Sequence, residues 1–187
     1  SLDTLPSQNI NEVAFFGRSN VGKSSLINSL TNKKKLAKFS KTPGRTRQLN
    51  FFKIENKLHS LNFVDFPGYG FAKTSKTEQR EWRNLIFDYI CSRQNLRTIL
   101  LLIDARRELT KEDNKMIEFF ESKGLGWTCI ITKVDKIKKS EVCSKLINLK
   151  NALKNKITLY PHLFFTSSEK KTGLEELRAY IAMFAKN

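Results

Sequence analysis

Residues 17–24 read Gly-Arg-Ser-Asn-Val-Gly-Lys-Ser and fit the pattern G-x-x-x-x-G-K-[ST]. An apolar run at 13–16 precedes them and a helical pattern follows, so the segment is expected to be a loop between a strand and a helix. Glycines in such a loop let backbone N–H groups turn inward around phosphate oxygens. Lys23 is expected to reach the β- and γ-phosphates of a nucleotide, and the Ser24 hydroxyl to bind Mg²⁺. A Gly-rich turn is the plainer alternative, but this context favours a phosphate-binding loop.

Outward from this loop, apolar runs of strand length alternate with helical patterns. The alternation predicts an α/β fold with a mostly parallel sheet and helices on both faces. A short polar turn at 55–57 predicts an antiparallel hairpin with one strand at the sheet edge, and Thr110 with Asp113 predicts a helix cap. The expected strands are 13–16, 49–54, 58–64, 98–103, 127–131 and 162–165, and the expected helices are 23–30, 77–92, 111–122, 140–153 and 173–184. Ligands of such sheets bind at the carboxyl ends of the strands, so the loops there are the candidate sites.

The third expected strand ends in Asp65-Phe66-Pro67-Gly68. A strand-end aspartate is well placed to hold the Mg²⁺ shell through a water molecule. The Gly68 N–H is placed to meet a γ-phosphate and so to sense its hydrolysis. The pattern D-x-x-G is common in turns, so this segment taken alone favours an ordinary turn.

The fifth expected strand ends in Thr132-Lys133-Val134-Asp135. A carboxylate accepts hydrogen bonds from the N1–H and N2–H₂ groups of guanine, and adenine lacks both donors. Asp135 therefore predicts a preference for guanine, and the Lys133 stem is expected to cover the base. Thr166-Ser167-Ser168 follow the sixth strand, where their backbone amides are expected to reach guanine O6. A charged loop and a helix-capping loop are the plainer alternatives for these two segments.

A fifth segment, Thr42-Pro43-Gly44-Arg45-Thr46, lies between the first helix and the second strand. A loop there would supply a hydroxyl to Mg²⁺ when a γ-phosphate is present, and Thr42 and Thr46 both suit this role. All five segments occur in the order of a GTPase, and four of them sit at expected strand ends. Their joint occurrence indicates a GTPase far more strongly than any one match does.

The composition bounds the partners and the compartment. The chain has 187 residues, enough for one domain with a sizeable core. Its longest apolar run, at 99–103, is far below the roughly 18 residues that span a bilayer, and no secretory signal pattern precedes the first strand. Three cysteines without metal-ligand spacing favour a reduced compartment, so we expect a cytoplasmic protein.

The charge is strongly positive, with 34 Lys and Arg against 18 Asp and Glu and a formal net charge of +16. Residues 33–47 hold seven basic residues and no acid, and residues 133–156 hold eight lysines and two acids. Such clusters favour a polyanionic partner, which would be RNA, DNA or an anionic membrane. A solvated Lys-rich surface is the alternative.

The motifs resemble those of the EngB family of bacterial GTPases, also called YihA or YsxC, which are related to Era and EngA. The resemblance covers the chain from about residue 11 and is carried by residues 17–25, 42–46, 65–70 and 132–135. It implies a Ras-like P-loop GTPase domain with six strands at 11–187, after an N-terminal lead-in at 1–10. It also implies a role in assembling the large ribosomal subunit, with links to cell division and septation, and so ribosomal RNA and ribosomal proteins as partners of a monomer.

The resemblance assigns Mg²⁺ to Ser24 and Thr46, with Asp65 acting through water, and thereby chooses Thr46 over Thr42. It implies Mg²⁺-dependent hydrolysis of GTP to GDP and phosphate, with Lys23, Thr46, Gly68 and Asn20 as the catalytic candidates. The implied nucleotide contacts are Gly17, Arg18, Ser19, Asn20, Val21, Gly22, Lys23, Ser24, Ser25, Gly44, Arg45, Thr46, Arg47, Gln48, Asp65, Phe66, Pro67, Gly68, Thr132, Lys133, Val134, Asp135, Thr166, Ser167 and Ser168.

Hydrolysis is expected to be slow, because many GTPases orient the attacking water with a Gln directly after D-x-x-G, and this chain has Tyr69 there. Tyr69 is alternatively a surface aromatic that contacts a partner. Asn20 resembles the loop asparagine that binds K⁺ in related cation-dependent GTPases, although it would also serve simply to brace the loop. K⁺ is therefore a second expected cofactor.

Two other functional classes remain open from the sequence. A P-loop ATPase or kinase would share the phosphate loop, but Asp135 in its context argues against it. A GTP-binding interaction protein with little turnover would share every motif. Competition of GTP with ATP separates the first class from a GTPase, and measurement of turnover separates the second.

Overall fold

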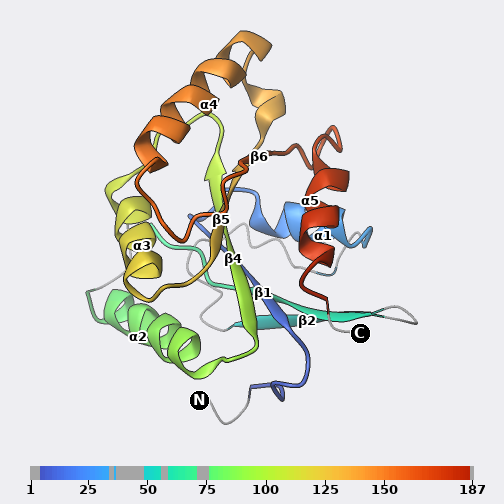
Figure 1. Ribbon diagram of the computed structural model, residues 1–187, viewed down its shortest axis with the longest axis vertical. Helices are drawn as coiled ribbons and strands as arrows, with labels where there is room; N and C mark the ends of the chain where they lie inside the picture. Colours follow the sequence, from blue (N-terminus) through green and yellow to red (C-terminus); the bar gives the residue numbers. More distant parts are fainter. Residues whose placement is uncertain (1–4, 34–35, 37–48, 56–58, 71–75, 186–187) are drawn as a thin grey trace.

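The computed structural model describes residues 5–33, 36, 49–55, 59–70 and 76–185, and within these ranges the chain forms an α/β structure (Figure 1). The strands are β1 (Glu12–Gly17), β2 (Asn50–Glu55), β3 (Ser60–Asp65), β4 (Leu96–Asp104), β5 (Trp127–Thr132) and β6 (Phe164–Phe165). The helices are α1 (Lys23–Leu30), α2 (Lys76–Ser92), α3 (Lys111–Ser122), α4 (Lys139–Leu153) and α5 (Leu174–Ala182), with a short 3₁₀ helix, η2, at Val134–Lys136. Every expected strand and helix is present, and among the elements of the described residues only η2 was not predicted.

The strands form one six-stranded sheet in the order β2-β3-β1-β4-β5-β6. β2 and β3 pair antiparallel and the other neighbours pair parallel. The predicted hairpin is therefore confirmed, with β2 on one edge of the sheet. Because β1, β3, β4, β5 and β6 run in the same direction, their carboxyl ends gather at one edge, where the candidate segments follow them.

Helices cover both faces of the sheet, as the alternating pattern predicted (Figure 1). On one face, α2, α3 and α4 pack through residues such as Tyr89, Phe120 and Leu149. On the other face, α1 and α5 pack through residues such as Ile27 and Leu177. The core strands are apolar on both sides, which explains why β1, β4 and β5 lack a polar alternation in the sequence. No helix in the described ranges is long and apolar enough to cross a membrane.

The predicted cap on α3 is present in full. The Thr110 side chain accepts a hydrogen bond from the Asp113 backbone N–H, and the Asp113 carboxylate accepts one from the Thr110 backbone N–H at 2.8 Å. This reciprocal pair satisfies two N–H groups that a helix start leaves without partners. The cap also fixes where the loop after β4 ends, and that loop borders the candidate site.

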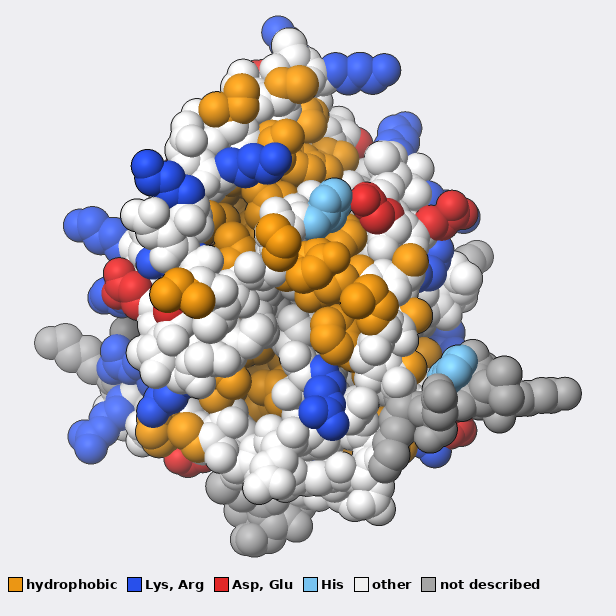
Figure 2. All heavy atoms as spheres, in the orientation of Figure 1, with side chains coloured by type: hydrophobic (Ala, Val, Ile, Leu, Met, Phe, Trp, Pro, Cys, Tyr) orange, Lys and Arg blue, Asp and Glu red, His pale blue; other side chains and the backbone are white. Residues whose placement is uncertain are grey.

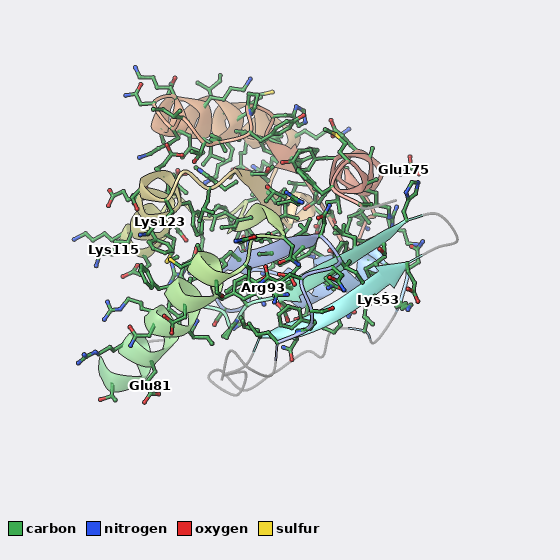
Figure 3. All side chains as sticks on the ribbon, turned by 60° about the horizontal axis from the view of Figure 1, so that its bottom comes forward. Lys53, Glu81, Arg93, Lys115, Lys123 and Glu175 are labelled. Atoms are coloured by element: carbon green, nitrogen blue, oxygen red, sulfur yellow. The ribbon has the colours of Figure 1, made fainter. Side chains whose placement is uncertain are left out.

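A buried ionic cluster joins the start of β1 to the end of α2, away from the candidate site. The Arg93 guanidinium forms an ion pair with the Glu12 carboxylate, and the Tyr89 hydroxyl donates to the same carboxylate. Arg93 also donates to the Pro6 carbonyl at 2.8 Å. Glu12 is fully buried and Arg93 is buried, and Figure 3 shows Arg93 near the end of α2 toward the middle of the molecule, whereas Lys115 stands at its edge. We call Glu12, Tyr89 and Arg93 the N-terminal cluster.

Candidate functional site

The predicted phosphate loop joins β1 to α1, as the sequence pattern indicated. Gly22 is the N-cap of α1 and has φ 106°, a left-handed conformation that favours glycine. Asn20 also has a positive φ of 62°, which asparagine tolerates better than most residues. The loop thus has two positive-φ residues directly before the N-terminus of α1, a position where phosphate binds well.

The loop lysine meets the strand-end aspartate. The Lys23 ammonium forms an ion pair with Asp65 Oδ1, and the two side chains are only 11% and 9% exposed. Burial raises the pKa of Asp65, and the charge of Lys23 offsets this only in part. A second cation beside Asp65 would favour its ionised form further.

The residues here suit Mg²⁺ bound together with a nucleotide. No cluster of three or more His, Cys, Asp or Glu residues in the described part of the chain would hold a metal by itself. Mg²⁺ at nucleotide sites typically takes one or two protein ligands and completes its shell with phosphates and water. Ser24 in the first turn of α1 and the buried carboxylate of Asp65 fit this requirement.

Residues 65–70 lie directly against the phosphate loop. Tyr69 N–H donates to the Gly17 carbonyl at 3.3 Å, and Ser19 N–H donates to the Tyr69 carbonyl at 3.0 Å. A Cβ on Gly68 would lie 2.8 Å from Ser19 Oγ and 2.9 Å from Ser19 N, so only glycine fits there without a shift. The segment predicted to sense a γ-phosphate is thus held next to the loop predicted to bind it.

The expectation that Tyr69 is a surface aromatic is wrong. Tyr69 is 6% exposed, and its hydroxyl donates to Asp113 Oδ1 at 2.6 Å. Burial and the neighbouring Asp113 carboxylate raise the pKa of the Tyr69 phenol. The side chain is therefore committed to the cap of α3 and does not stand in for the water-orienting Gln of other GTPases.

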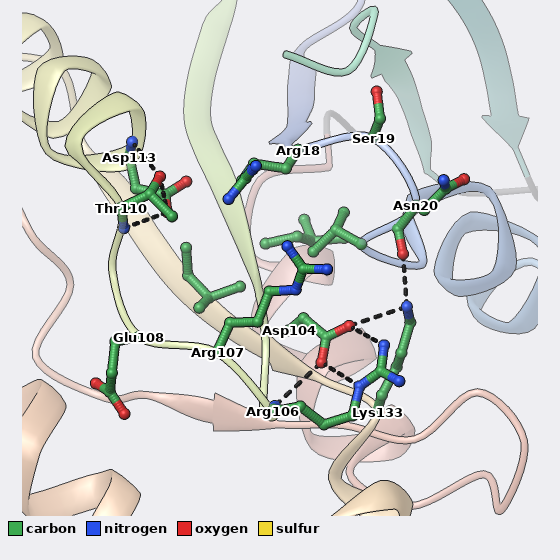
Figure 4. Close-up of a pocket in the computed structure, with 13 residues that line it drawn as sticks. Arg18, Ser19, Asn20, Asp104, Arg106, Arg107, Glu108, Thr110, Asp113 and Lys133 are labelled. Atoms are coloured by element: carbon green, nitrogen blue, oxygen red, sulfur yellow. Dashed lines mark hydrogen bonds and ion pairs between the residues drawn. The ribbon is translucent and has the colours of Figure 1, made fainter. Parts of the chain in front are cut away.

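The segment after β5 is tied to the phosphate loop. Thr132 Oγ1 donates to the Val21 carbonyl at 2.7 Å. The Lys133 ammonium donates to the Asn20 carbonyl at 2.5 Å, so its stem crosses beside the loop (Figure 4). That the Lys133 stem covers a guanine base stays a prediction.

Asp135 lies beside the loop after β6. Ser167 Oγ donates to Asp135 Oδ1 at 2.5 Å, and Val134 N–H donates to the Thr166 carbonyl at 3.2 Å. The hydrogen bond from Ser167 is the main cause that lowers the pKa of Asp135 and keeps it ionised. Asp135 Oδ2 is buried and accepts no hydrogen bond from any described residue, although the Lys136 ammonium is 3.2 Å away. Because this oxygen is buried, a neighbouring group has to move before a base can donate to it.

Asp104 was not singled out from the sequence. It ends β4 and is 6% exposed, and its carboxylate pairs with Arg106 at 2.7 Å and with Lys133 at 3.0 Å. Burial alone would raise its pKa, but the hydrogen bonds from Arg106 and Lys133 outweigh burial and lower the pKa. Its position in the sequence could have indicated it, because Asp104 directly follows the apolar run 99–103, just as Asp65 directly follows an expected strand.

Four of the five predicted segments therefore meet at the carboxyl edge of the sheet, namely those at 17–25, 65–68, 132–135 and 166–168. The fifth predicted segment, at 42–46, lies outside the described residues, and so do all the predicted contacts at 44–48, including Thr46.

The chain resembles known proteins over almost its full length. A family described as "50S ribosome-binding GTPase" matches residues 12–134. Curated relatives include the "Probable GTP-binding protein EngB" of Hyphomonas neptunium, 45% identical over 99% of this chain and 84% of the relative. The protein of the same name from Gluconobacter oxydans is 42% identical over 98% of this chain and 80% of the relative.

Solved structures support the same likeness. A crystal structure of "a probable GTP-binding protein engB" is 26% identical, with a TM-score of 0.70 over 92% of this chain and 97% of that one. Era bound to MgGDPNP and a segment of 16S ribosomal RNA has a TM-score of 0.76 over 95% of this chain and 57% of Era. At 23% identity, the likeness to Era concerns the fold alone.

Proposed function

The chain belongs to the EngB family of GTP-binding proteins and has a Ras-like GTPase fold, and from that premise we propose a GTP-hydrolysing switch that assists assembly of the large ribosomal subunit. The observation that most supports the nucleotide site is the meeting of Lys133, Asp135 and the phosphate loop at one sheet edge. The family resemblance adds a link to cell division and septation. The proposed domain is a single one, at 11–187.

In the proposed site, Lys23 and the N–H groups of the loop bind the β- and γ-phosphates, and Asp135 selects guanine. Ser24 and Thr46 ligate Mg²⁺, with Asp65 acting through water, and the ion neutralises charge on the phosphates when it is bound. Gly68 N–H contacts the γ-phosphate. Because Gly68 is packed on Ser19 of the phosphate loop, loss of that phosphate would directly change the contacts of residues 65–70.

Lys23→Ala and Ser24→Ala are expected to damage different properties. Loss of the Lys23 charge should weaken GDP and GTP together, by roughly 10- to 100-fold, because hydrogen bonds to charged groups contribute about 1.5–3 kcal/mol each. Ser24→Ala should chiefly reduce the Mg²⁺ dependence of binding, and Thr46→Ala should spare GDP while weakening the GTP-bound state. Titration of each variant with fluorescent GDP and GTP analogues, with and without Mg²⁺, measures this.

Lys115→Ala is the matched control, because Lys115 is an exposed lysine on α3 (Figure 3). Thermal unfolding of each variant accompanies the titrations, since Lys23→Ala also leaves Asp65 without its ion-pair partner. Equal loss of GDP binding in all three site variants would contradict the proposed division of roles.

Hydrolysis is expected to be faster in KCl than in NaCl at equal ionic strength. Tyr69 is buried against α3, so another group must stabilise the charge that develops on the phosphates. A K⁺ ion held by Asn20 is the proposed source. Because Asn20 has φ 62°, Asn20→Gly removes the amide without straining the backbone, and it should abolish the difference between the two salts. Identical rates in both salts, with Asn20→Gly and Asn20→Ala also neutral, would remove K⁺ from the mechanism.

Binding to ribosomal large subunits is expected to depend on the bound nucleotide and to fall steeply with salt. Lys and Arg side chains spread over the outer surface of α2, α3 and α4 (Figure 2), although Lys145 of α4 is buried and bonded to the Arg107 carbonyl. Phosphate contacts release counterions, so affinity should decrease with added salt. The GTP-bound state should bind subunits about 5- to 150-fold more tightly than the GDP-bound state, and by linkage subunits should favour GTP over GDP by the same factor.

The test of the proposed function is co-sedimentation of the protein with purified large subunits, with GDP and with a non-hydrolysable GTP analogue, across a salt series. Tighter binding with the analogue that weakens with salt supports the switch. Equal affinity in both states, or affinity independent of salt, would refute the ribosomal part of the proposal and leave the GTPase assignment standing.

A further inference from the structure

A cavity of about 160 Å³ lies beside the phosphate loop, between that loop and the loop that joins β4 to α3 (Figure 4). Its walls come from residues 18–21 on one side and 104–110 on the other, with Asp113 and Lys133 at its ends. None of the guanine, phosphate or Mg²⁺ roles proposed above uses residues 106–110. The cavity therefore borders the proposed nucleotide site on one wall, and its other wall has no role in that site.

Every carboxylate that lines the cavity already has partners. Asp104 pairs with Arg106 at 2.7 Å and with Lys133 at 3.0 Å. Asp113 accepts from the Tyr69 hydroxyl at 2.6 Å and from the Thr110 hydroxyl at 2.7 Å.

Glu108 completes the set, with the Lys145 ammonium 3.0 Å from its carboxylate. Asp104 and Glu108 are thus paired with cations, whereas Asp113 keeps its charge because its donors are neutral hydroxyls. The lining still holds four cationic side chains, Arg18, Arg106, Arg107 and Lys133, against these three carboxylates.

Two arginines on opposite walls are left without such partners. Figure 4 shows Arg18 extending from the phosphate loop and Arg107 from the loop after β4, with their guanidinium groups in the space between. Neither guanidinium forms an ion pair or a hydrogen bond with any residue in the described part of the chain. The Arg18 side chain passes close to Gly70, where an added Cβ would lie 2.8 Å from its Nε.

The chemistry of this pair selects an anion with several acceptor oxygens. A guanidinium presents planar, paired donors that match the oxygens of a phosphate, and two guanidiniums facing one space can hold one phosphate from both sides. The formal net charge of +16 favours a polyanion over a single acidic side chain as the source of that group. RNA offers a phosphate at every nucleotide, so one can enter the cavity while its neighbours meet the surrounding basic surface.

We propose that the cavity between the phosphate loop and the β4–α3 loop binds a backbone phosphate of RNA through Arg18 and Arg107. The proposal rests on the proposed action on ribosomal particles and gives that action a contact point on the protein. Arg107 is the residue on which to test it, because it lies outside the proposed nucleotide site and its side chain is exposed.

The experiment compares Arg107→Glu with Arg83→Glu in the full chain with GDP bound. Both are exposed arginines, neither side chain has a described ion-pair partner, and Arg83 lies on α2 away from the cavity. The probe is a fluorescent single-stranded uridylate dodecamer, titrated over a salt series. Arg107→Glu should weaken RNA binding about tenfold or more and lower the salt slope by about one, whereas Arg83→Glu should change it much less. GDP affinity should be unchanged in both variants.

Three results would overturn the proposal. Equal losses of RNA affinity in the two variants, or no loss in Arg107→Glu, would refute this site. RNA binding by the wild-type protein would then still support the proposed function. Absence of RNA binding by the wild-type protein would refute the site and the RNA part of the proposed function together. Competition by a polyglutamate peptide as strong as that by unlabelled RNA, and lost in Arg107→Glu, would assign the cavity to an acidic protein partner instead.

Discussion

Asp135→Asn is expected to weaken GTP and GDP by roughly 100- to 10,000-fold and to create affinity for xanthine nucleotides. The ionised Asp135 carboxylate accepts two guanine donors in the proposed site, and hydrogen bonds to charged groups contribute about 1.5–3 kcal/mol each. Its Oδ2 accepts no hydrogen bond from a described residue, and because this oxygen is buried beside the Lys136 ammonium, a neighbouring group has to move before the base donates to it. Xanthine carries an oxygen in place of the N2 donor, and an asparagine amide can donate to that oxygen.

The measurement is the dissociation constant of fluorescent GDP, XDP and ADP for wild type and variant. Asp88→Asn on the exposed face of α2 makes the same chemical change away from the site and should alter none of these constants. Thermal unfolding is needed as well, because Asp135 also accepts from Ser167 and lies near Lys136. Wild-type protein that binds ADP as tightly as GDP, or a folded variant that gains no affinity for XDP, would show that Asp135 does not recognise the base.

Arg93→Ala is expected to lower the free energy of unfolding by about 3–5 kcal/mol, the range for breaking a buried ion pair by removing one partner. In the N-terminal cluster, Glu12 is fully buried and Arg93 is 7% exposed. Without Arg93, the Glu12 carboxylate keeps only the Tyr89 hydroxyl as a described side-chain donor. The Pro6 carbonyl also loses its guanidinium donor, so the chain before β1 would be held less firmly.

Urea unfolding followed by circular dichroism measures this free energy. Arg83→Ala, an exposed arginine on the same helix, should change it by less than about 0.5 kcal/mol. The double variant Glu12→Gln with Arg93→Ala removes the stranded charge and should be more stable than Arg93→Ala alone. If Arg93→Ala unfolded like wild type, the cluster would not contribute to stability. If the double variant were no better, the penalty would come from lost packing and not from charge.

Patterns that depend on near neighbours in the sequence predicted the structure well. Apolar runs located all six strands, and the spacing of Thr110 and Asp113 located the start of α3. The phosphate loop was also predictable, because its glycines and its flanking strand and helix are contiguous. Such features are set by local backbone chemistry, which a sequence displays directly.

Features that depend on contacts between distant segments were not predictable. Tyr69 follows a glycine in a polar-looking turn, and only the position of α3 decides that its hydroxyl meets Asp113. Lys145 reads as one of many surface lysines, yet the packing of α4 buries its side chain against the β4–α3 loop. Asp104 pairs with Arg106, its neighbour in the sequence, but only the fold brings its second partner, Lys133, to it.

The bond between Tyr69 and Asp113 joins a segment that is predicted to sense the nucleotide to the first turn of a helix. Asp113 caps α3 through Thr110, and an N-cap interaction contributes about 0.5–2 kcal/mol to a helix. A displacement of residues 65–70 that withdrew the Tyr69 hydroxyl would leave the Asp113 carboxylate short of one donor and loosen that turn. Loss of a phosphate would then fray the start of α3 at residues 110–113. The change would thereby reach the protein surface at this helix end.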